Sequence, residues 1–257
     1  MTQSYQYIES LRADIARLEG QGGLKAPGAV LPFGIGMLDR HLPGGGLRLS
    51  GLHEMADAGP GLGYGSAAAL MAAGILARLA GPVLWASERD DLFPPALAGV
   101  GLHPDRVLHV FAPRSVPLVM EEGLRHGRAA GIVGEMATWL SPTAARRLQL
   151  AAEAAGLPAF ALCRPRSEGR AGGAPPIAAL TRWRITRLPS GPALPEAPEV
   201  PGLARALWQV DLIRGRGAEP ASWIVEACDE TGHLRLPAAL ADRQVAAATG
   251  STRRRTA

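Results

Sequence analysis

The chain has 257 residues, 47% of them hydrophobic, which is enough apolar material for one α/β domain with appendages. Its net charge of +4 permits contact with nucleic acid or an acidic partner without requiring either. No apolar run is long enough to predict a membrane span and nothing resembles a signal peptide, so we expect a cytoplasmic protein. The two cysteines, Cys163 and Cys228, and the six histidines show no metal-ligand spacing, so we expect buried free thiols and no metal site.

The N-terminal segment, residues 5–19, has helical periodicity and ends at a cluster of glycines. Its apolar face consists of Ile8, Leu11, Ile15 and Leu18. That face either belongs to the core or docks on another chain, and the sequence favours neither alternative. A linker rich in glycine follows, so we divide the chain into 1–28 (helix and linker), 29–240 (one domain) and 241–257 (a tail expected to be disordered).

Residues 49–80 carry the strongest local pattern in the chain. They predict a strand over 49–55, a glycine-rich turn and a helix over 66–80. This is the layout of a phosphate-binding loop, in which backbone N–H groups and a helix N-terminus face an anion. A complete loop ends in Gly-Lys-Ser/Thr, whereas this one has Tyr64 and contains no lysine. The pattern therefore predicts a degenerate site with weak ATP or anion binding at most, formed by Gly59, Gly61, Gly63, Tyr64, Gly65 and Ser66.

Strands and helices alternate after this loop. Strands are predicted at 83–87, 107–111, 131–133 and 158–163, and helices at 116–128 and at 142–155, the latter capped by Ser141 and closed by Gly156. Such alternation favours a mainly parallel sheet with helices on both faces. Glu88 and Glu135 follow two of these strands, at the sheet edge where sites form in open α/β folds. Each is either a catalytic acid of a nucleotide site or a hydrogen-bonded loop residue, and the missing lysine favours the second alternative.

The character of the chain changes after Cys163. Residues 164–176 predict a basic loop, 181–188 a half-exposed strand, 189–201 a proline-rich linker, and 203–214 with 222–227 an antiparallel hairpin. Arginine side chains can contact the phosphates of single-stranded DNA. The candidates for that role are Arg164, Arg166, Arg170, Arg182 and Arg184, and the alternative is a solvated loop. Trp208 and Trp223 on the hairpin are expected to pack across strands.

In this order and spacing, the segments resemble the RecA-type recombinase core over about residues 30–228. The approach FGIGMLD, GGGL and GLHE (residues 33–54) resembles the lead into the RecA phosphate-binding loop, and LWASERDD (84–91) resembles the strand that carries the catalytic glutamate, here Glu88. Glu135 falls at the Walker B position. The fold implied is a RecA-type, P-loop NTPase-like core.

The hairpin WQVDLIRGRGAEPASWIVE (208–226) and the degenerate loop resemble most closely the ImuA family, RecA-like members of a bacterial mutagenesis cassette. The resemblance implies a non-catalytic accessory factor, without a cofactor, in damage-induced (SOS) translesion synthesis. It implies as partners ImuB, a polymerase-like adaptor, and an error-prone replicative-type polymerase. RecA is a further partner by analogy, through the N-terminal helix. Two alternatives stay open, namely a DNA-dependent ATPase of the RecA type and a SulA-like inhibitor of a filament-forming protein.

Overall fold

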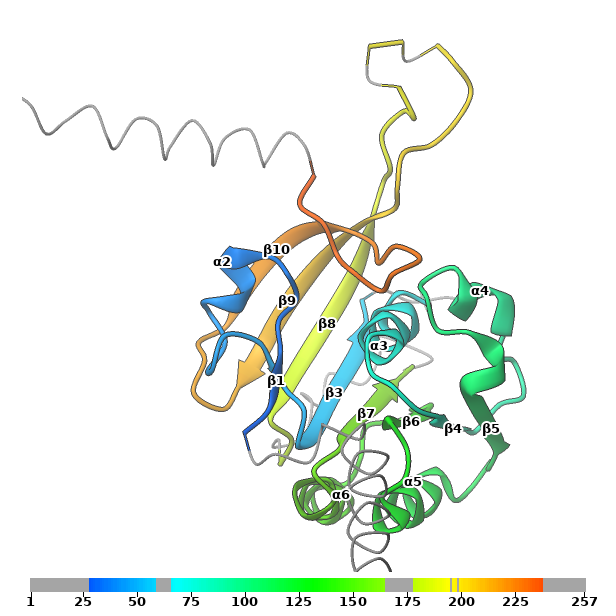
Figure 1. Cartoon of the computed structure of the whole chain (residues 1–257), viewed down its shortest axis with the longest axis vertical. Helices are drawn as coiled ribbons and strands as arrows, with labels where there is room; N and C mark the ends of the chain where they lie inside the picture. The colour runs from blue at the N-terminus through cyan, green and yellow to red at the C-terminus, as the bar shows by residue number, and fades with distance from the viewer. Residues whose placement is uncertain (1–27, 59–65, 165–177, 195, 198, 238–257) are drawn as a thin grey trace, which may run out of the picture.

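The computed structural model describes residues 28–58, 66–164, 178–194, 196–197 and 199–237. Its centre is an eight-stranded sheet of order β10-β9-β8-β3-β7-β6-β4-β5 (Figure 1). The strands are β3 (Gly51–Asp57), β4 (Val83–Ser87), β5 (Val107–Phe111), β6 (Gly131–Met136), β7 (Pro158–Cys163), β8 (Thr181–Leu188), β9 (Leu207–Gly215) and β10 (Ala221–Glu226). All pairs from β8 across to β5 are parallel, and β9 and β10 add antiparallel strands at the other edge. The predicted parallel α/β sheet with a C-terminal hairpin is thus confirmed.

Helices cover both faces of the parallel strands. One face packs against α3 (Ala67–Ala77) and α4 (Pro94–Ala98), and the other packs against α5 (Val116–His126) and α6 (Pro142–Ala155). A 3₁₀ turn, η1 (Pro104–Arg106), leads from α4 into β5. Parallel strands need such crossover connections, which bury both faces of the sheet.

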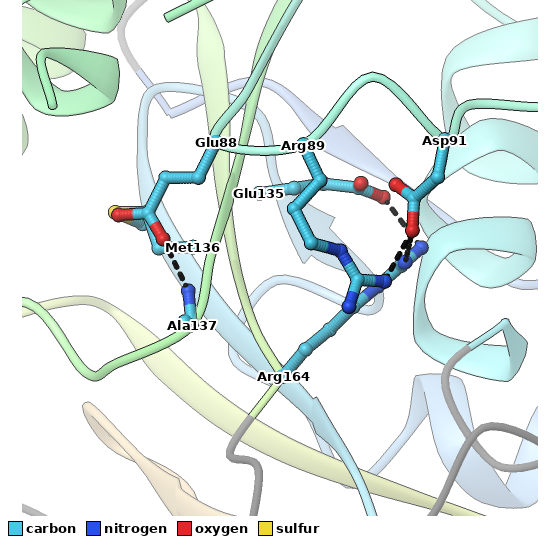
Figure 2. A pocket seen from close by; sticks show the side chains of 7 residues that line it. All are labelled: Glu88, Arg89, Asp91, Glu135, Met136, Ala137 and Arg164. Carbon is cyan, nitrogen blue, oxygen red and sulfur yellow. Dashed lines mark hydrogen bonds and ion pairs between the residues drawn. The ribbon is translucent and has the colours of Figure 1, made fainter. Parts of the chain in front are cut away.

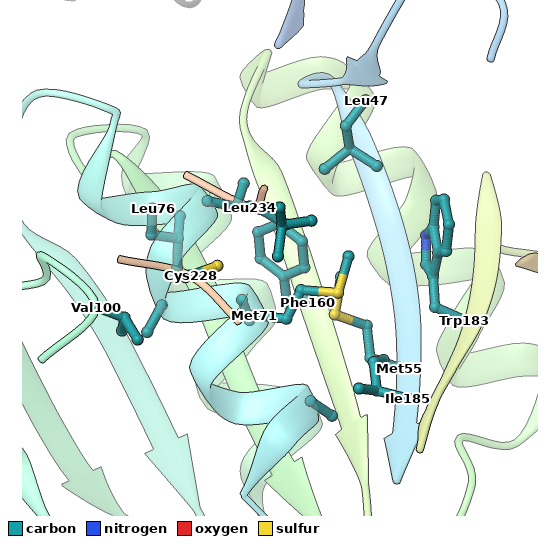
Figure 3. Close-up of a cluster of buried hydrophobic side chains, with 14 of the residues drawn as sticks. Leu47, Met55, Met71, Leu76, Val100, Phe160, Trp183, Ile185, Cys228 and Leu234 are labelled. Carbon is teal, nitrogen blue, oxygen red and sulfur yellow. The ribbon is translucent and has the colours of Figure 1, made fainter. Parts of the chain in front are cut away.

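The helix α3 has almost no polar face. Its sequence, AAALMAAGILA, is buried nearly throughout, because a segment after β10 crosses its outer surface. In Figure 3, Cys228 and Leu234 from that segment lie beside Met71 and Leu76 of α3. A helix that is apolar all round has to be covered on every side. We call residues 227–237 the C-terminal strap.

A small antiparallel ribbon precedes the main sheet. It consists of β1 (Val30–Leu31) and β2 (Leu47–Arg48), with the short helix α2 (Gly36–Asp39) between them. The Asp39 carboxylate accepts hydrogen bonds from the backbone N–H groups of Phe33 (2.6 Å) and Gly34 (2.9 Å). This ribbon was not predicted, because its two strands are only two residues long and lie in a glycine- and proline-rich stretch.

Most of the predicted boundaries are confirmed. The strands at 83–87, 107–111, 158–163 and 181–188 have the predicted limits. The helix α6 begins where the Ser141 hydroxyl accepts a hydrogen bond from the Ala144 N–H (3.2 Å) and ends at Gly156, which has a left-handed φ of 68°. Trp208 and Trp223 are buried at 2% and 8% exposure, as expected of packing residues.

Other predicted boundaries are wrong by a few residues. The first sheet strand spans 51–57 rather than 49–55, because its partners on both sides set its limits. The predicted helix 66–80 ends at Ala77, and the predicted strand 131–133 continues to Met136, where it still pairs with β7. The helix predicted over 116–128 ends at His126, since Gly127 adopts a left-handed φ of 68°.

Candidate functional site

The candidate site lies at one edge of the sheet. The parallel strands β3, β4, β6 and β7 all end there, and register pairs join Ser87 to Glu135 and Met136 to Cys163. The side chains that follow or close these strands therefore meet, although they are far apart in the sequence. They are Asp57, Glu88, Glu135 and Arg164.

Asp57 closes β3 directly before the glycine-rich stretch. Its Oδ1 accepts a hydrogen bond from the backbone N–H of Ala68, in the first turn of α3, at 3.0 Å. Burial raises the pKa of Asp57 to about 6, although the Ala68 N–H and the positive charge of Arg164 act in the opposite direction. A backbone amide at a helix N-terminus is the kind of donor that binds phosphate, and here a carboxylate of the same chain accepts from it.

Glu88 follows β4 and points toward the loop after β6 (Figure 2). Its Oε2 accepts a hydrogen bond from the Ala137 N–H at 2.8 Å, and its own N–H donates to the Glu135 carbonyl at 3.1 Å. The side chain thus ties two neighbouring strand ends together. The geometry is that of the hydrogen-bonded loop acid that the sequence favoured.

Glu135 is buried, with 4% of the residue exposed, and pairs with a cation. The Arg164 Nη2 donates to its Oε1 at 2.9 Å. Burial raises the pKa of Glu135, and the positive charge of Arg164 counteracts this. Arg164 also lies 3.7 Å from the Asp91 carboxylate, which in turn pairs with Arg89.

These side chains enclose a small hollow (Figure 2). It measures about 20 Å³, which holds roughly one water molecule. Its lining residues are Glu88, Arg89, Asp91, Glu135, Met136, Ala137 and Arg164. Among the described residues, Asp57, Glu88 and Glu135 therefore each accept a hydrogen bond from a group of this chain.

Several predicted site residues lie outside the described residues. These are Gly59, Gly61, Gly63, Tyr64 and Gly65 of the loop, Arg166 and Arg170 of the basic stretch, and Ile8, Leu11, Ile15 and Leu18 of the N-terminal segment. Ser66 is described: it is exposed and directly precedes α3, and its side chain makes no capping hydrogen bond.

Arg182 differs from its predicted exposure. It is buried at 7% exposure, and its Nε donates to the Glu54 Oε2 at 2.7 Å. Its guanidinium also lies 4.7 Å from the centre of the Trp139 ring. The prediction that Arg182 projects from a half-exposed strand is therefore wrong. The ion pair joins residues 128 positions apart, so sequence alternation could not reveal it.

Arg184 lies on the exposed side, as the alternation predicted. Its Nε and Nη2 donate to the Asp211 Oδ2 at 3.1 and 3.0 Å. Gln209 and Ser222 donate to the other oxygen of Asp211, and these hydrogen bonds help to lower the pKa of that carboxyl against the effect of burial. Trp139 was missed by the sequence analysis, because an aromatic residue in a loop carries no periodicity.

Two further findings concern other classes of site. Both cysteines are buried free thiols, as predicted, and burial raises the pKa of each to about 12. No three His, Cys, Asp or Glu side chains gather as metal ligands within the described ranges. None of the helices in those ranges combines the length and apolar character that crossing a bilayer requires.

Comparison with known proteins places the chain in a family. No protein-family model matches it. Protein ImuA from each of two strains of Caulobacter vibrioides is 39% identical over 248 residues, which covers 91% of this chain and 99% of the relative. The crystal structure of the RadB recombinase superposes with a TM-score of 0.56 over 80% of this chain and 98% of that one. At 17% identity this likeness concerns the fold alone. By its identity to these relatives over nearly the whole length, the chain belongs to the ImuA family.

Proposed function

We propose that this ImuA-family chain is a non-catalytic accessory factor in damage-induced translesion DNA synthesis, which recruits or scaffolds error-prone polymerase components. Family membership supports a place in the mutagenesis cassette. The RecA-type fold supports descent from a nucleotide-dependent core. Neither fold nor family decides whether the core hydrolyses ATP, so this question depends on the side chains of the candidate site.

The observation that carries the non-catalytic part is the contact of Asp57 with Ala68. Its carboxylate accepts from an amide of the first turn of α3, at 3.0 Å, in a loop that has no lysine. A phosphate would have to displace this carboxylate or approach it closely. Losing a charge-assisted lysine contact costs about 1.5–3 kcal/mol of binding, before any repulsion from Asp57 is counted.

The remaining acids support the same proposal. A general base has to be oriented toward the attacking water, whereas these acids are oriented toward groups of the chain. The Oε2 of Glu88 already accepts from Ala137, and Oε1 of Glu135 already accepts from Arg164. Without a polarised phosphate, these contacts hold the strand ends together and have no reaction to catalyse.

ATP hydrolysis by the purified full chain tests this part directly. We expect no turnover of MgATP above the protein-free rate, with or without single-stranded DNA, while a RecA-type recombinase measured in parallel does turn over. Glu88→Gln should leave this baseline unchanged. Turnover by the wild-type chain that Glu88→Gln abolishes would contradict the proposal and favour a DNA-dependent ATPase.

The recruiting part needs protein partners. We propose the polymerase-like adaptor ImuB and the error-prone replicative-type polymerase as partners, and RecA as a further one through the N-terminal helix. Co-purification of ImuB with the full chain is the expected result. Removing residues 1–20, with their apolar face of Ile8, Leu11, Ile15 and Leu18, should selectively weaken the contact with RecA. Failure of the full chain to retain ImuB would argue against the scaffold role.

A further inference from the structure

An exposed segment joins β8 to β9. Residues 189–206 leave the sheet after Leu188 and return at Leu207, and in Figure 1 the yellow trace projects well beyond the body of the molecule. We call these residues the proline arm. It is longer than the roughly 12–15 residues beyond which loops in compact domains become uncommon and are usually either functional or linker segments.

The arm has a three-residue repeat in its sequence. Prolines occur at every third position, namely Pro189, Pro192, Pro195, Pro198 and Pro201. The residue before each later proline is glycine or apolar, and the series is Gly191, Leu194, Ala197 and Val200, with Leu203 continuing it. Proline fixes its own φ and limits the residue before it, so the repeat reduces the number of conformations that the arm can adopt.

Hydrogen bonds hold the base and the middle of the arm. At the base, the Ala204 N–H donates to the Gly191 carbonyl at 3.0 Å, next to a β-bridge between Pro192 and Leu203. Further out, the Ala197 N–H donates to the Leu194 carbonyl at 3.1 Å, and the Val200 N–H donates to the Ala197 carbonyl at 3.1 Å. These hydrogen bonds restrain the backbone on both sides of the arm and in its middle, which reduces the backbone ordering that binding would require.

Apolar side chains on this projection face water. Leu203 is 78% exposed, Leu194 is 43% exposed and Val200 is 41% exposed. All three belong to the same register of the repeat, so one short segment gathers several exposed apolar groups. Such groupings on a soluble protein mark interaction sites.

The charge of the arm favours one class of partner. Its first charged residues are Glu196 and Glu199, both exposed, and no basic residue precedes Arg205. The arm is thus an acidic projection on a chain whose net charge is +4. Carboxylates repel nucleic-acid phosphates and attract lysine and arginine, which favours a protein surface as the partner.

We propose that the proline arm is a docking element for a protein partner. Leu194, Val200 and Leu203 enter an apolar groove of that partner, and lysine or arginine side chains at the groove rim pair with Glu196 and Glu199. This inference rests on the proposed recruiting function, and we take the polymerase-like adaptor ImuB as the probe.

Binding of purified ImuB to the full chain tests the inference in two steps. The wild-type chain should bind ImuB, and Leu203→Asp should weaken that binding about tenfold or more, as truncation of an anchor residue does. The double variant Glu196→Gln/Glu199→Gln should weaken binding at low salt and reduce its salt dependence. Matched controls are Leu150→Asp, at an exposed leucine of α6, and Glu230→Gln in the strap; both should bind as the wild type does.

The outcomes separate the two proposals. If the wild-type chain does not bind ImuB, the recruiting function fails and the arm inference fails with it. If the wild type binds and Leu203→Asp binds equally well, the arm inference alone is wrong. Light scattering of the chain by itself tests whether the arm instead binds a second copy of this chain. A dimer that Leu203→Asp dissociates would show this and would contradict the proposal.

Discussion

At the scale of single residues, Asp57 best illustrates how the acids of the candidate site are used. Its half-buried carboxylate accepts from a backbone amide in the first turn of α3, which is the kind of donor that binds phosphate in phosphate-binding loops. Glu88 and Glu135, which the resemblance to RecA aligns with catalytic acids, contact the chain itself. The carboxylates thus serve local structure.

The raised pKa of Asp57 predicts a pH effect. Burial raises it from 3.8 in the free side chain to about 6 in the folded chain. Between pH 4 and 6 the folded state therefore binds more protons at this site than the unfolded state, and the contribution of Asp57 to the free energy of unfolding falls as the pH rises. The loss is up to about 3 kcal/mol and is complete about one pH unit above the folded pKa.

Asp57→Asn removes this titration and keeps an oxygen that accepts from Ala68. The free energy of unfolding of the variant, relative to wild type, should therefore increase from about pH 4 to about pH 7 and then stay constant. Urea denaturation of both proteins over this range measures the difference, in which the contributions of the other groups largely cancel. Parallel curves would show that Asp57 does not titrate there.

The buried pair of Arg182 and Glu54 makes a second prediction at this scale. Their side chains are 8% and 2% exposed and 2.6 Å apart. Removing one partner leaves an uncompensated buried charge, so Arg182→Met and Glu54→Gln should each lower the free energy of unfolding by about 3–5 kcal/mol. The loss is smaller if the remaining partner becomes neutral. The double variant Glu54→Gln/Arg182→Met should cost less than the sum of the two. Urea denaturation of all four proteins measures this coupling, and strict additivity would contradict it.

At the scale of elements, the contact between α3 and the C-terminal strap is close enough to test. A Cβ at Gly74 would lie 2.5 Å from the Cys228 Sγ and 2.9 Å from its Cβ. Gly74→Ala gains up to about 1 kcal/mol of helix propensity but overpacks a filled interface, which costs about 1–3 kcal/mol. We therefore expect a net loss of stability, read as a lower urea midpoint.

Two further variants make this prediction specific. Cys228→Ala removes the nearer atom, so it should recover part of the stability lost in Gly74→Ala when the two are combined. Gly191→Ala introduces a Cβ that has nothing within 4 Å and should be close to neutral. A Gly74→Ala chain that is more stable than wild type would mean that the strap does not pack on α3 as described.

Elements with local signals could be predicted, and contacts between distant segments could not. The helix α6 was placed to the residue because Ser141 and Gly156 mark its ends chemically. The sheet strand β3 was displaced by two residues, since its limits depend on β7 and β8. Likewise, the sequence predicted that Glu88 and Glu135 lie at the sheet edge, because each follows a predicted strand. It could not show that Arg182 is buried or that Asp57 contacts Ala68, because both follow from packing.

At the scale of the whole molecule, charge is unevenly distributed. The proline arm carries Glu196 and Glu199, whereas the sequence from Arg164 to Arg170 is basic. Protein and nucleic-acid contacts would then use two segments of opposite charge. This separation lets the two kinds of binding be tested independently.

Single-stranded DNA binding remains a prediction, and it belongs to this scale because it depends on summed charge. We expect salt-dependent affinity, whose logarithm falls with log salt concentration by about 0.7 for each phosphate contacted. Arg166→Gln/Arg170→Gln should reduce that slope by about 1.4, whereas Arg182→Met should leave it unchanged, since Arg182 is buried. Fluorescence anisotropy of a labelled oligonucleotide measures this salt dependence.

The charge-matched control is Arg128→Gln/Arg146→Gln. Both arginines are exposed, one shortly after α5 and one on α6, and the variant should retain the wild-type slope. Absence of binding at low salt, or equal slopes for both double variants, would exclude the basic stretch as a DNA contact.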